Sequence, residues 1–298
     1  MSQTLVTSRD PEGRHATRLF KAVYNKSKLD GAGAERLNEH VGELQDGIAK
    51  LIAELSMSDQ YTDEEVRSSY TYPKEYKGPR PIVDQVKAIA KILGLYPSPA
   101  LEFAKKLPAL PDGAEGWFAI PSVDALAKKH FRKVTDPALK YCFAIDLVLD
   151  KIEASRSFEN CRLGLIPPER LRVHARTAHA LDLIAETQKG DILIVAAQLG
   201  MRHRGKSVRR AREVFTANEF GLGNLAVGSI VLTHPERLVR WEELDMDCSG
   251  DEFSSFSNPS YFGNSSYFVF RDRKVEFDTH FDSNPSSGLG AVSGFLSQ

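Results

Sequence analysis

The sequence lacks an excess of charge of either sign. Its 298 residues include 39 Lys and Arg against 40 Asp and Glu, which gives a formal net charge of −1. A domain dedicated to nucleic acid usually carries a clear basic excess. Any nucleic-acid role must therefore depend on a local basic patch and not on the charge of the whole molecule.

The chain is also poor in cysteine and in long apolar runs. Its three cysteines, Cys142, Cys161 and Cys248, form no CxxC pair, which argues against a zinc ribbon or a disulfide scaffold and favours a reducing compartment. No apolar run approaches the roughly 18 residues that span a bilayer. The first fifteen residues have no apolar core of the kind that marks a secretory signal. We therefore expect a soluble, cytoplasmic protein with no membrane partner.

The apolar pattern that is present predicts an α+β protein with two regions. Residues 1–165 are expected to be mainly helical. Residues 166–298 are expected to be mixed α/β or β-rich and to end in a hairpin, because 275–281 alternate between apolar and polar side chains. A compact apolar run at 191–199 predicts a buried strand. We also expect a helix over 167–188 and loosely held residues after 283.

Short sequence signals fix several boundaries in the first region. Residues 115–121 read as a short strand that ends at Pro121. Ser122 is placed as the N-cap of a following helix. Asp136 and Pro137 stand at the cap and at the first position of a long apolar helix.

A further helix is predicted over residues 35–56. Apolar side chains recur there at alternating spacings of four and three: Leu37, Val41, Leu44, Ile48, Leu51 and Leu55. Such a stripe either packs against the protein's own core or forms a seam between two copies of the chain. Gly42 and Gly47 weaken an isolated helix and favour the core.

The stretch GMRHRGKS, residues 200–207, fits the phosphate-loop pattern G-x-x-x-x-G-K-[ST]. Gly200 and Gly205 would permit a tight loop, Lys206 would reach the outer phosphates of a nucleotide, and Ser207 would bind magnesium. A strand before the loop and a helix after it suit this interpretation. The bulky loop interior, the short chain beyond it and the lack of a following strand that ends in Asp argue against it.

The same stretch opens the most basic part of the chain, residues 202–212, which we call the basic segment. Its six cations are Arg202, Arg204, Lys206, Arg209, Arg210 and Arg212. Arginine is suited to bidentate contact with phosphate. This favours a phosphate-rich partner, DNA or RNA, whose binding would weaken strongly with salt.

An internal partner for these cations is also conceivable. Residues 241–252, WEELDMDCSGDE, carry six acids and no base, and they are expected to face the basic segment across the fold or to form a solvated surface. Exposed pairs of this kind contribute only about 0–1 kcal/mol each.

The acidic stretch has a sharper interpretation as a degenerate calcium loop. Asp245, Asp247 and Ser249 occupy the first, third and fifth positions of D-x-D-x-S-G, and Asp251 follows. Position twelve is Phe256, where a bidentate Glu is required, so a surface turn is the better interpretation.

The leading hypothesis is a binding protein that presents the basic segment to phosphate groups, most plausibly of nucleic acid. The alternatives are a nucleotide-binding enzyme with Mg²⁺ at residues 200–207, and a structural or protein-interaction protein. Its partner would be an acidic protein surface or a second copy bound through helix 35–56. The sequence assigns no catalytic residue and requires no cofactor.

Overall fold

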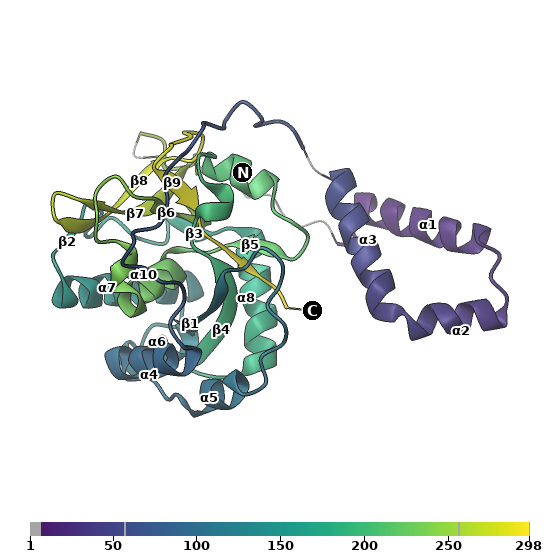
Figure 1. Ribbon diagram of the computed structural model, residues 1–298, viewed down its shortest axis with the longest axis horizontal. Helices are drawn as coiled ribbons and strands as arrows, with labels where there is room; N and C mark the ends of the chain where they lie inside the picture. The colour runs from purple at the N-terminus through teal and green to yellow at the C-terminus, as the bar shows by residue number, and fades with distance from the viewer. Residues whose placement is uncertain (1–6, 57, 256, 298) are drawn as a thin grey trace. The chain divides into compact units, whose positions relative to one another are not determined.

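The computed structural model describes residues 7–56, 58–255 and 257–297. Over these residues the chain forms ten α-helices and two β-sheets, with the helices concentrated before the strands (Figure 1). The predicted α+β class is confirmed. The chain divides into two compact units, of which the first ends at Ser58 and the second begins at Asp59. The boundary expected at 165–166 lies inside the second unit, where it stays a prediction.

The first unit consists of three helices, α1 (Pro11–Lys26), α2 (Gly31–Glu39) and α3 (Val41–Ser56). The Asp30 carboxylate begins α2 by accepting a hydrogen bond from the Gly33 amide at 2.7 Å. The prediction of a single helix over 35–56 is wrong, because the helical structure there is divided in two. The backbone leaves helical geometry at His40, with φ −102° and ψ 33°. The apolar stripe is therefore shared between two helices.

The smaller sheet of the second unit has four antiparallel strands in the order β1-β4-β10-β5. They are β1 (Gly116–Pro121), β4 (Ile192–Gln198), β10 (Ser293–Phe295) and β5 (Glu219–Gly221). The strands predicted for β1 and β4 are confirmed. All seven residues of β4 are buried, because α4 (Ile82–Leu93), α5 (Ser98–Ala104) and α8 (Ala175–Gln188) pack on this sheet.

The larger sheet has the order β2-β8-β7-β6-β3, and β9 (Leu289–Ala291) pairs with β6 in parallel. Its other strands are β2 (Phe158–Asn160), β3 (Leu171–Val173), β6 (Asp245–Phe253), β7 (Asn264–Arg271) and β8 (Lys274–Phe281). The predicted hairpin is confirmed as β7 and β8. Its turn places Asp272 and Arg273 at positive φ, 49° and 65°.

The helix α10 (Asn224–Thr233) contacts strands of both sheets and the long helix α7 (Pro137–Ser155). Almost all of its side chains are buried, as expected of a helix that is apolar on every side.

The predicted caps are confirmed, since Ser122 accepts a hydrogen bond from Ala125 at the start of α6 (Val123–His130) and Asp136 accepts one from Leu139 at 2.8 Å.

Two expectations about the C-terminal region are wrong. The helix expected over 167–188 begins only at Ala175, because residues 171–173 pair with β6 and the His174 amide donates to the Gly250 carbonyl. The described residues near the end of the chain, which were expected to be loosely held, form the strands β9 and β10. Strand β10 lies between β4 and β5, and its three residues are buried.

Within the described residues, no helix combines the length and the apolar character needed to cross a bilayer. The three cysteines are free, and Cys142 and Cys248 are buried.

Candidate functional site

The local geometry expected for residues 192–213 is present. Strand β4 ends at Gln198, a short 3₁₀ turn follows at Met201–His203, and α9 (Val208–Glu213) begins after Ser207. The Ser207 hydroxyl caps α9 by accepting from the Arg210 amide at 3.1 Å. Gly200 and Gly205 have φ of 115° and 76°, a region that glycine enters without strain.

The backbone N–H groups of the predicted phosphate loop already have acceptors within the chain. The Gln198 side-chain oxygen accepts from Gly200 at 2.7 Å, and the Tyr72 hydroxyl accepts from Met201 at 3.0 Å. The amides of Gly205 and Ser207 donate to the carbonyls of Leu289 and Glu64, each at 3.0 Å. A phosphate cradle needs such amides to point at the ligand. A nucleotide would have to replace these intramolecular acceptors.

The groups that were expected to meet phosphate and magnesium contact a different part of the chain. Lys206 Nζ donates to Glu65 at 2.8 Å, and Ser207 Oγ donates to Glu64 at 2.6 Å. Both carboxylates belong to residues 59–66, DQYTDEEV, which we call the acidic strap. The strap follows the helical unit directly in the sequence.

Backbone pairing holds the strap against the loop. The Val66 amide donates to the Gly205 carbonyl at 2.8 Å, and the Ser207 amide donates to the Glu64 carbonyl at 3.0 Å. These bonds flank a single antiparallel bridge between Glu65 and Lys206. The strap therefore acts as one short strand beside the start of α9.

Arg209 and Glu64 form the central ion pair of this contact. Arg209 Nε lies 2.8 and 2.7 Å from the two carboxylate oxygens, and Nη2 donates to one of them as well. The guanidinium also lies over the Tyr61 ring, 4.3 Å from its centroid. Burial by itself would raise the pKa of Glu64, but the hydrogen bonds from Arg209 and Ser207 and the charge of Arg209 hold that pKa below its ordinary value.

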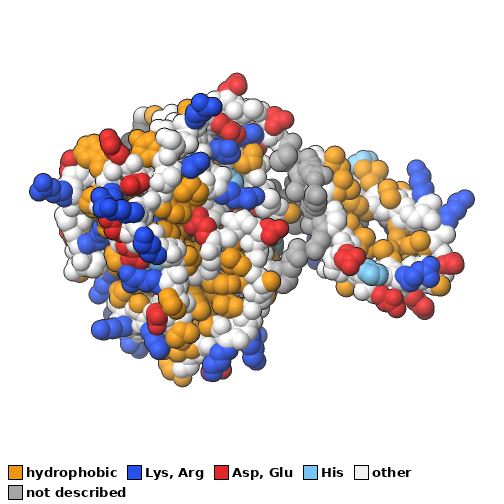
Figure 2. Space-filling model, viewed as in Figure 1, with side chains coloured by type: hydrophobic (Ala, Val, Ile, Leu, Met, Phe, Trp, Pro, Cys, Tyr) orange, Lys and Arg blue, Asp and Glu red, His pale blue; other side chains and the backbone are white. Residues whose placement is uncertain are grey.

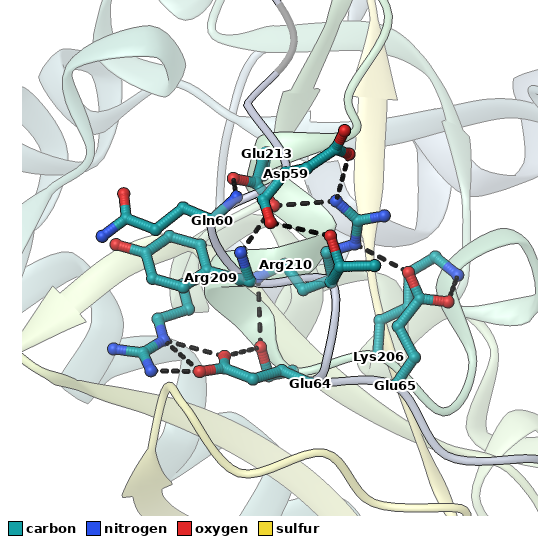
Figure 3. Close-up of polar contacts among 11 residues, drawn as sticks. Asp59, Gln60, Glu64, Glu65, Lys206, Arg209, Arg210 and Glu213 are labelled. Atoms are coloured by element: carbon teal, nitrogen blue, oxygen red, sulfur yellow. Dashed lines mark hydrogen bonds and ion pairs between the residues drawn. The ribbon is translucent and has the colours of Figure 1, made fainter.

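Arg210 joins the strap to the end of α9. Its Nε donates to Glu65 at 2.7 Å, and its Nη1 donates to Glu213 at 2.8 Å and lies 3.8 Å from Asp59. The Glu213 carboxylate in turn accepts from the Gln60 amide at 2.9 Å (Figure 3). Hydrogen bonds from Lys206 and Arg210 lower the pKa of Glu65. The carboxylates of Glu64 and Glu65 are thus stabilised in their charged form.

The other three cations of the basic segment also have partners within the chain. Arg202 lies 3.3 Å from the Glu219 carboxylate, and Arg204 donates to the Tyr70 carbonyl at 3.1 Å. Arg212 is nearly buried and donates to the carbonyls of Ser249 at 2.8 Å and Asp251 at 2.7 Å. All six positive charges are directed at acceptors of the protein itself.

The acidic partner expected at residues 241–252 is therefore mostly replaced by the strap. Arg212 reaches that stretch, but it does so through backbone carbonyls. The strap was not recognised from the sequence as a partner of the basic segment, although four acids fall within residues 59–65 with no base among them. That run is the signal that would have identified the partner.

A buried polar network under the loop was also missed. Glu219 is fully buried and accepts hydrogen bonds at 2.6 Å from Ser293 Oγ and from Nε2 of His203. Gln198 donates to Ser293 at 2.9 Å, which links the strands β4, β5 and β10. Burial favours a raised pKa for Glu219, but the His203 hydrogen bond and charge hold it below the ordinary value. The network fixes the loop from below.

The candidate calcium residues lie on a strand, so the predicted loop or surface turn is wrong. The extended strand spreads the four side chains along its length, and each has a different contact. Asp245 accepts from the Phe270 amide, Asp247 contacts His280, Ser249 donates to the Val292 carbonyl, and Asp251 accepts from Tyr141 and the Asn224 amide. Among the described residues, no three His, Cys, Asp or Glu side chains are grouped to hold a metal ion. Phe256 lies outside the described residues.

The chain also has a shallow apolar cavity of about 170 Å³. Phe103, Trp117, Leu183, Ile194 and Phe295 contribute to its lining. Pockets that hold small molecules usually enclose about 300–1,000 Å³ and combine apolar walls with a few convergent polar groups. This cavity is too small to define a ligand site.

Comparison with known proteins adds no assignment, because no family model, curated protein or solved structure matches the chain.

Proposed function

We propose that the protein is a protein-interaction protein whose binding surface is the helical segment of residues 7–58. One observation carries the proposal. Among the described residues of this segment none is buried, and ten large apolar side chains are exposed. They are Leu19, Phe20, Val23, Tyr24, Leu29, Val41, Leu44, Leu51, Ile52 and Leu55.

These side chains are arranged in stripes and are not scattered. In α1, Leu19, Phe20, Val23 and Tyr24 follow the spacing of one helical face. Figure 2 shows hydrophobic side chains gathered on these helices beside charged ones. Single exposed apolar residues are ordinary on protein surfaces, whereas contiguous apolar patches mark interaction sites.

The second unit behaves differently, which supports the assignment of the binding surface to the first. Most of its buried apolar side chains form one large core that includes Ile89, Leu149, Val195 and Phe268, and its eleven exposed large apolar side chains are spread over 240 residues, against ten over fewer than sixty residues in the helical segment. A body with a closed core does not need further partners to bury its apolar surface. The helical segment does, because helices of its length are marginal in water without packing of their apolar faces.

The basic segment then has a structural task. Its cations hold the strap to the second unit through Glu64 and Glu65. The strap is the first stretch of the second unit, so these ion pairs hold the beginning of that unit to its own α9. This is the third of the roles that the sequence suggested.

Phosphate binding by the basic segment stays a prediction, and it would require the strap to be displaced first. A nucleic acid would have to displace Glu64 and Glu65 from Arg209, Arg210 and Lys206 before it could contact these side chains. Binding would therefore exchange charge-assisted hydrogen bonds to carboxylate for charge-assisted hydrogen bonds to phosphate.

The proposal is tested with a dye that fluoresces on exposed apolar surface, anilinonaphthalene sulfonate, added to the folded full chain at low protein concentration. We expect enhanced fluorescence in the wild type and a clear loss in the double variant Leu44→Glu, Leu51→Glu. Gln45→Glu is the matched control, because Gln45 is an exposed polar residue of the same helix. Absence of dye binding by the monomeric wild type, or binding that the double variant retains, would refute the proposal.

A further inference from the structure

We infer that the partner of the helical segment is a second copy of this chain. The inference rests on the proposed function and names its partner. It is carried by the charges of the helices, by the spacing of the apolar residues and by the area they expose.

The helices of the segment carry opposite charges. α1 has four bases, Arg14, Arg18, Lys21 and Lys26, against the single acid Glu12. In contrast, α3 has three acids and one base in its sequence, VGELQDGIAKLIAELS, and α2 has two acids and one base. Each copy therefore presents both a basic and an acidic apolar-faced helix.

A two-fold symmetric pair uses this arrangement twice. When α1 of one protomer packs on α3 of the other, symmetry repeats the same contact with the roles exchanged. The apolar stripes are then covered, and bases flank acids along both contacts. A partner with a single charge sign would satisfy one helix and repel the other.

The balance of charge also separates this partner from an anionic membrane. Residues 2–58 contain eight basic and eight acidic residues, so the segment has no net charge. Helices that lie on anionic lipid are rich in Lys and Arg on their polar face. The acids of α2 and α3 oppose such binding.

The spacing in α3 suits a helix-helix seam. Val41, Leu44, Ile48, Leu51 and Leu55 alternate at three and four residues, the repeat of a coiled-coil interface. Val41, Leu44, Leu51 and Leu55 are exposed by between 37% and 78%. This alternation is the pattern that lets side chains of one helix insert between those of another.

The exposed area can supply a large part of what a stable dimer needs. At about 25 cal/mol per Å², the 1.5–3 kcal/mol gained on burying a whole apolar side chain corresponds to about 60–120 Å², and the ten side chains keep about half of their surface. They therefore offer up to about 600 Å² per protomer, before the aliphatic stems of Lys and Arg are included. Specific interfaces bury about 800 Å² per partner.

Sedimentation equilibrium of the full chain over a wide range of loading concentrations tests the inference. The apparent mass of the wild type and of Gln45→Glu is expected to rise with concentration from 33.1 kDa toward twice that value. The double variant Leu44→Glu, Leu51→Glu is expected to stay at the monomer mass throughout. An unchanged melting temperature of the second unit verifies that the variant still folds.

Two results would overturn the inference. One is a monomer mass for the wild type at every concentration, and the other is a dimer that survives in the double variant and therefore uses another surface. The dye experiment separates the two proposals. A monomeric wild type that binds dye through Leu44 and Leu51 retains the interaction surface and loses only the second copy as its partner. A monomeric wild type that binds no dye loses both.

Discussion

Replacing Glu64 by Gln tests whether the basic segment holds the strap. The Glu64 carboxylate accepts from Arg209 and, at 2.6 Å, from Ser207. Glutamine keeps the size of the side chain and removes its charge. The variant also leaves the backbone bonds of the strap free to form, so any loosening reports on the ion pair.

The expected loss follows from the exposure of the two partners. Hydrogen bonds to charged groups contribute about 1.5–3 kcal/mol, and solvent screening reduces this for exposed pairs. The side chains of Glu64 and Arg209 are 17% and 32% exposed, so the lower end applies. We expect a loss of about 1–1.5 kcal/mol, which corresponds to about tenfold faster opening of the strap.

Amide hydrogen exchange measures this opening at two reporters, the Val66 amide bound to Gly205 and the Ser207 amide bound to the Glu64 carbonyl. Both are expected to exchange about tenfold faster in Glu64→Gln. The control is Glu75→Gln, which removes the exposed partner of Arg240 and leaves the strap untouched. Equal exchange of both reporters in Glu64→Gln and in the wild type would refute the assignment of the basic segment as a clamp.

Two further predictions concern nucleic acid and pH. Fluorescence anisotropy is expected to show weak binding of an RNA or DNA oligonucleotide by the wild type at low salt. The double variant Glu64→Gln, Glu65→Gln is expected to bind the oligonucleotide more tightly, because the cations of the basic segment are released. Tight, salt-sensitive binding by the wild type would restore the phosphate hypothesis. Burial raises the pKa of Asp251 to about 7, although the Asn224 amide and the Tyr141 hydroxyl oppose this. The folded state therefore holds a proton that the unfolded chain releases near pH 3.8, and stability falls as the pH rises from about 4 to about 7, by up to about 1.4 kcal/mol per pH unit. Urea midpoints should show a shallower fall over this range in Asp251→Asn, and an equal fall in both proteins would contradict the assignment.

Much of the local structure could be predicted because its causes are local. Asp136 and Pro137 lie beside the helix they begin, and Ser207 lies beside the amide it caps. The hairpin β7–β8 could be predicted from the alternation of residues 275–281, which follow a two-residue turn. Strand β4 is recognisable because a strand buried on both faces is continuously apolar.

The errors arise where distant residues decide. Strand β10 has a weak apolar pattern of its own, and it is ordered because β4 and β5 supply pairing partners on both sides. Strand β3 replaces the expected start of a helix for the same reason, since it pairs with β6. The periodicity of apolar residues within a segment does not indicate which distant strand will pair with it.

The candidate site shows the same division. The cations of the basic segment and the cap at Ser207 could be placed on one short helix from sequence alone. The carboxylates that these cations contact could not be predicted, because Glu64 and Arg209 are separated by 145 residues in the chain. Two acidic runs were available as partners, and only the folded chain distinguishes the strap from residues 241–252.

The mass of the full chain in solution tests most directly whether the helical segment pairs two copies of this chain. Sedimentation equilibrium should show association toward twice 33.1 kDa for the wild type and a constant monomer mass for Leu44→Glu, Leu51→Glu. The same monomer mass for both proteins at every concentration would contradict the pairing of two chains through α1 and α3.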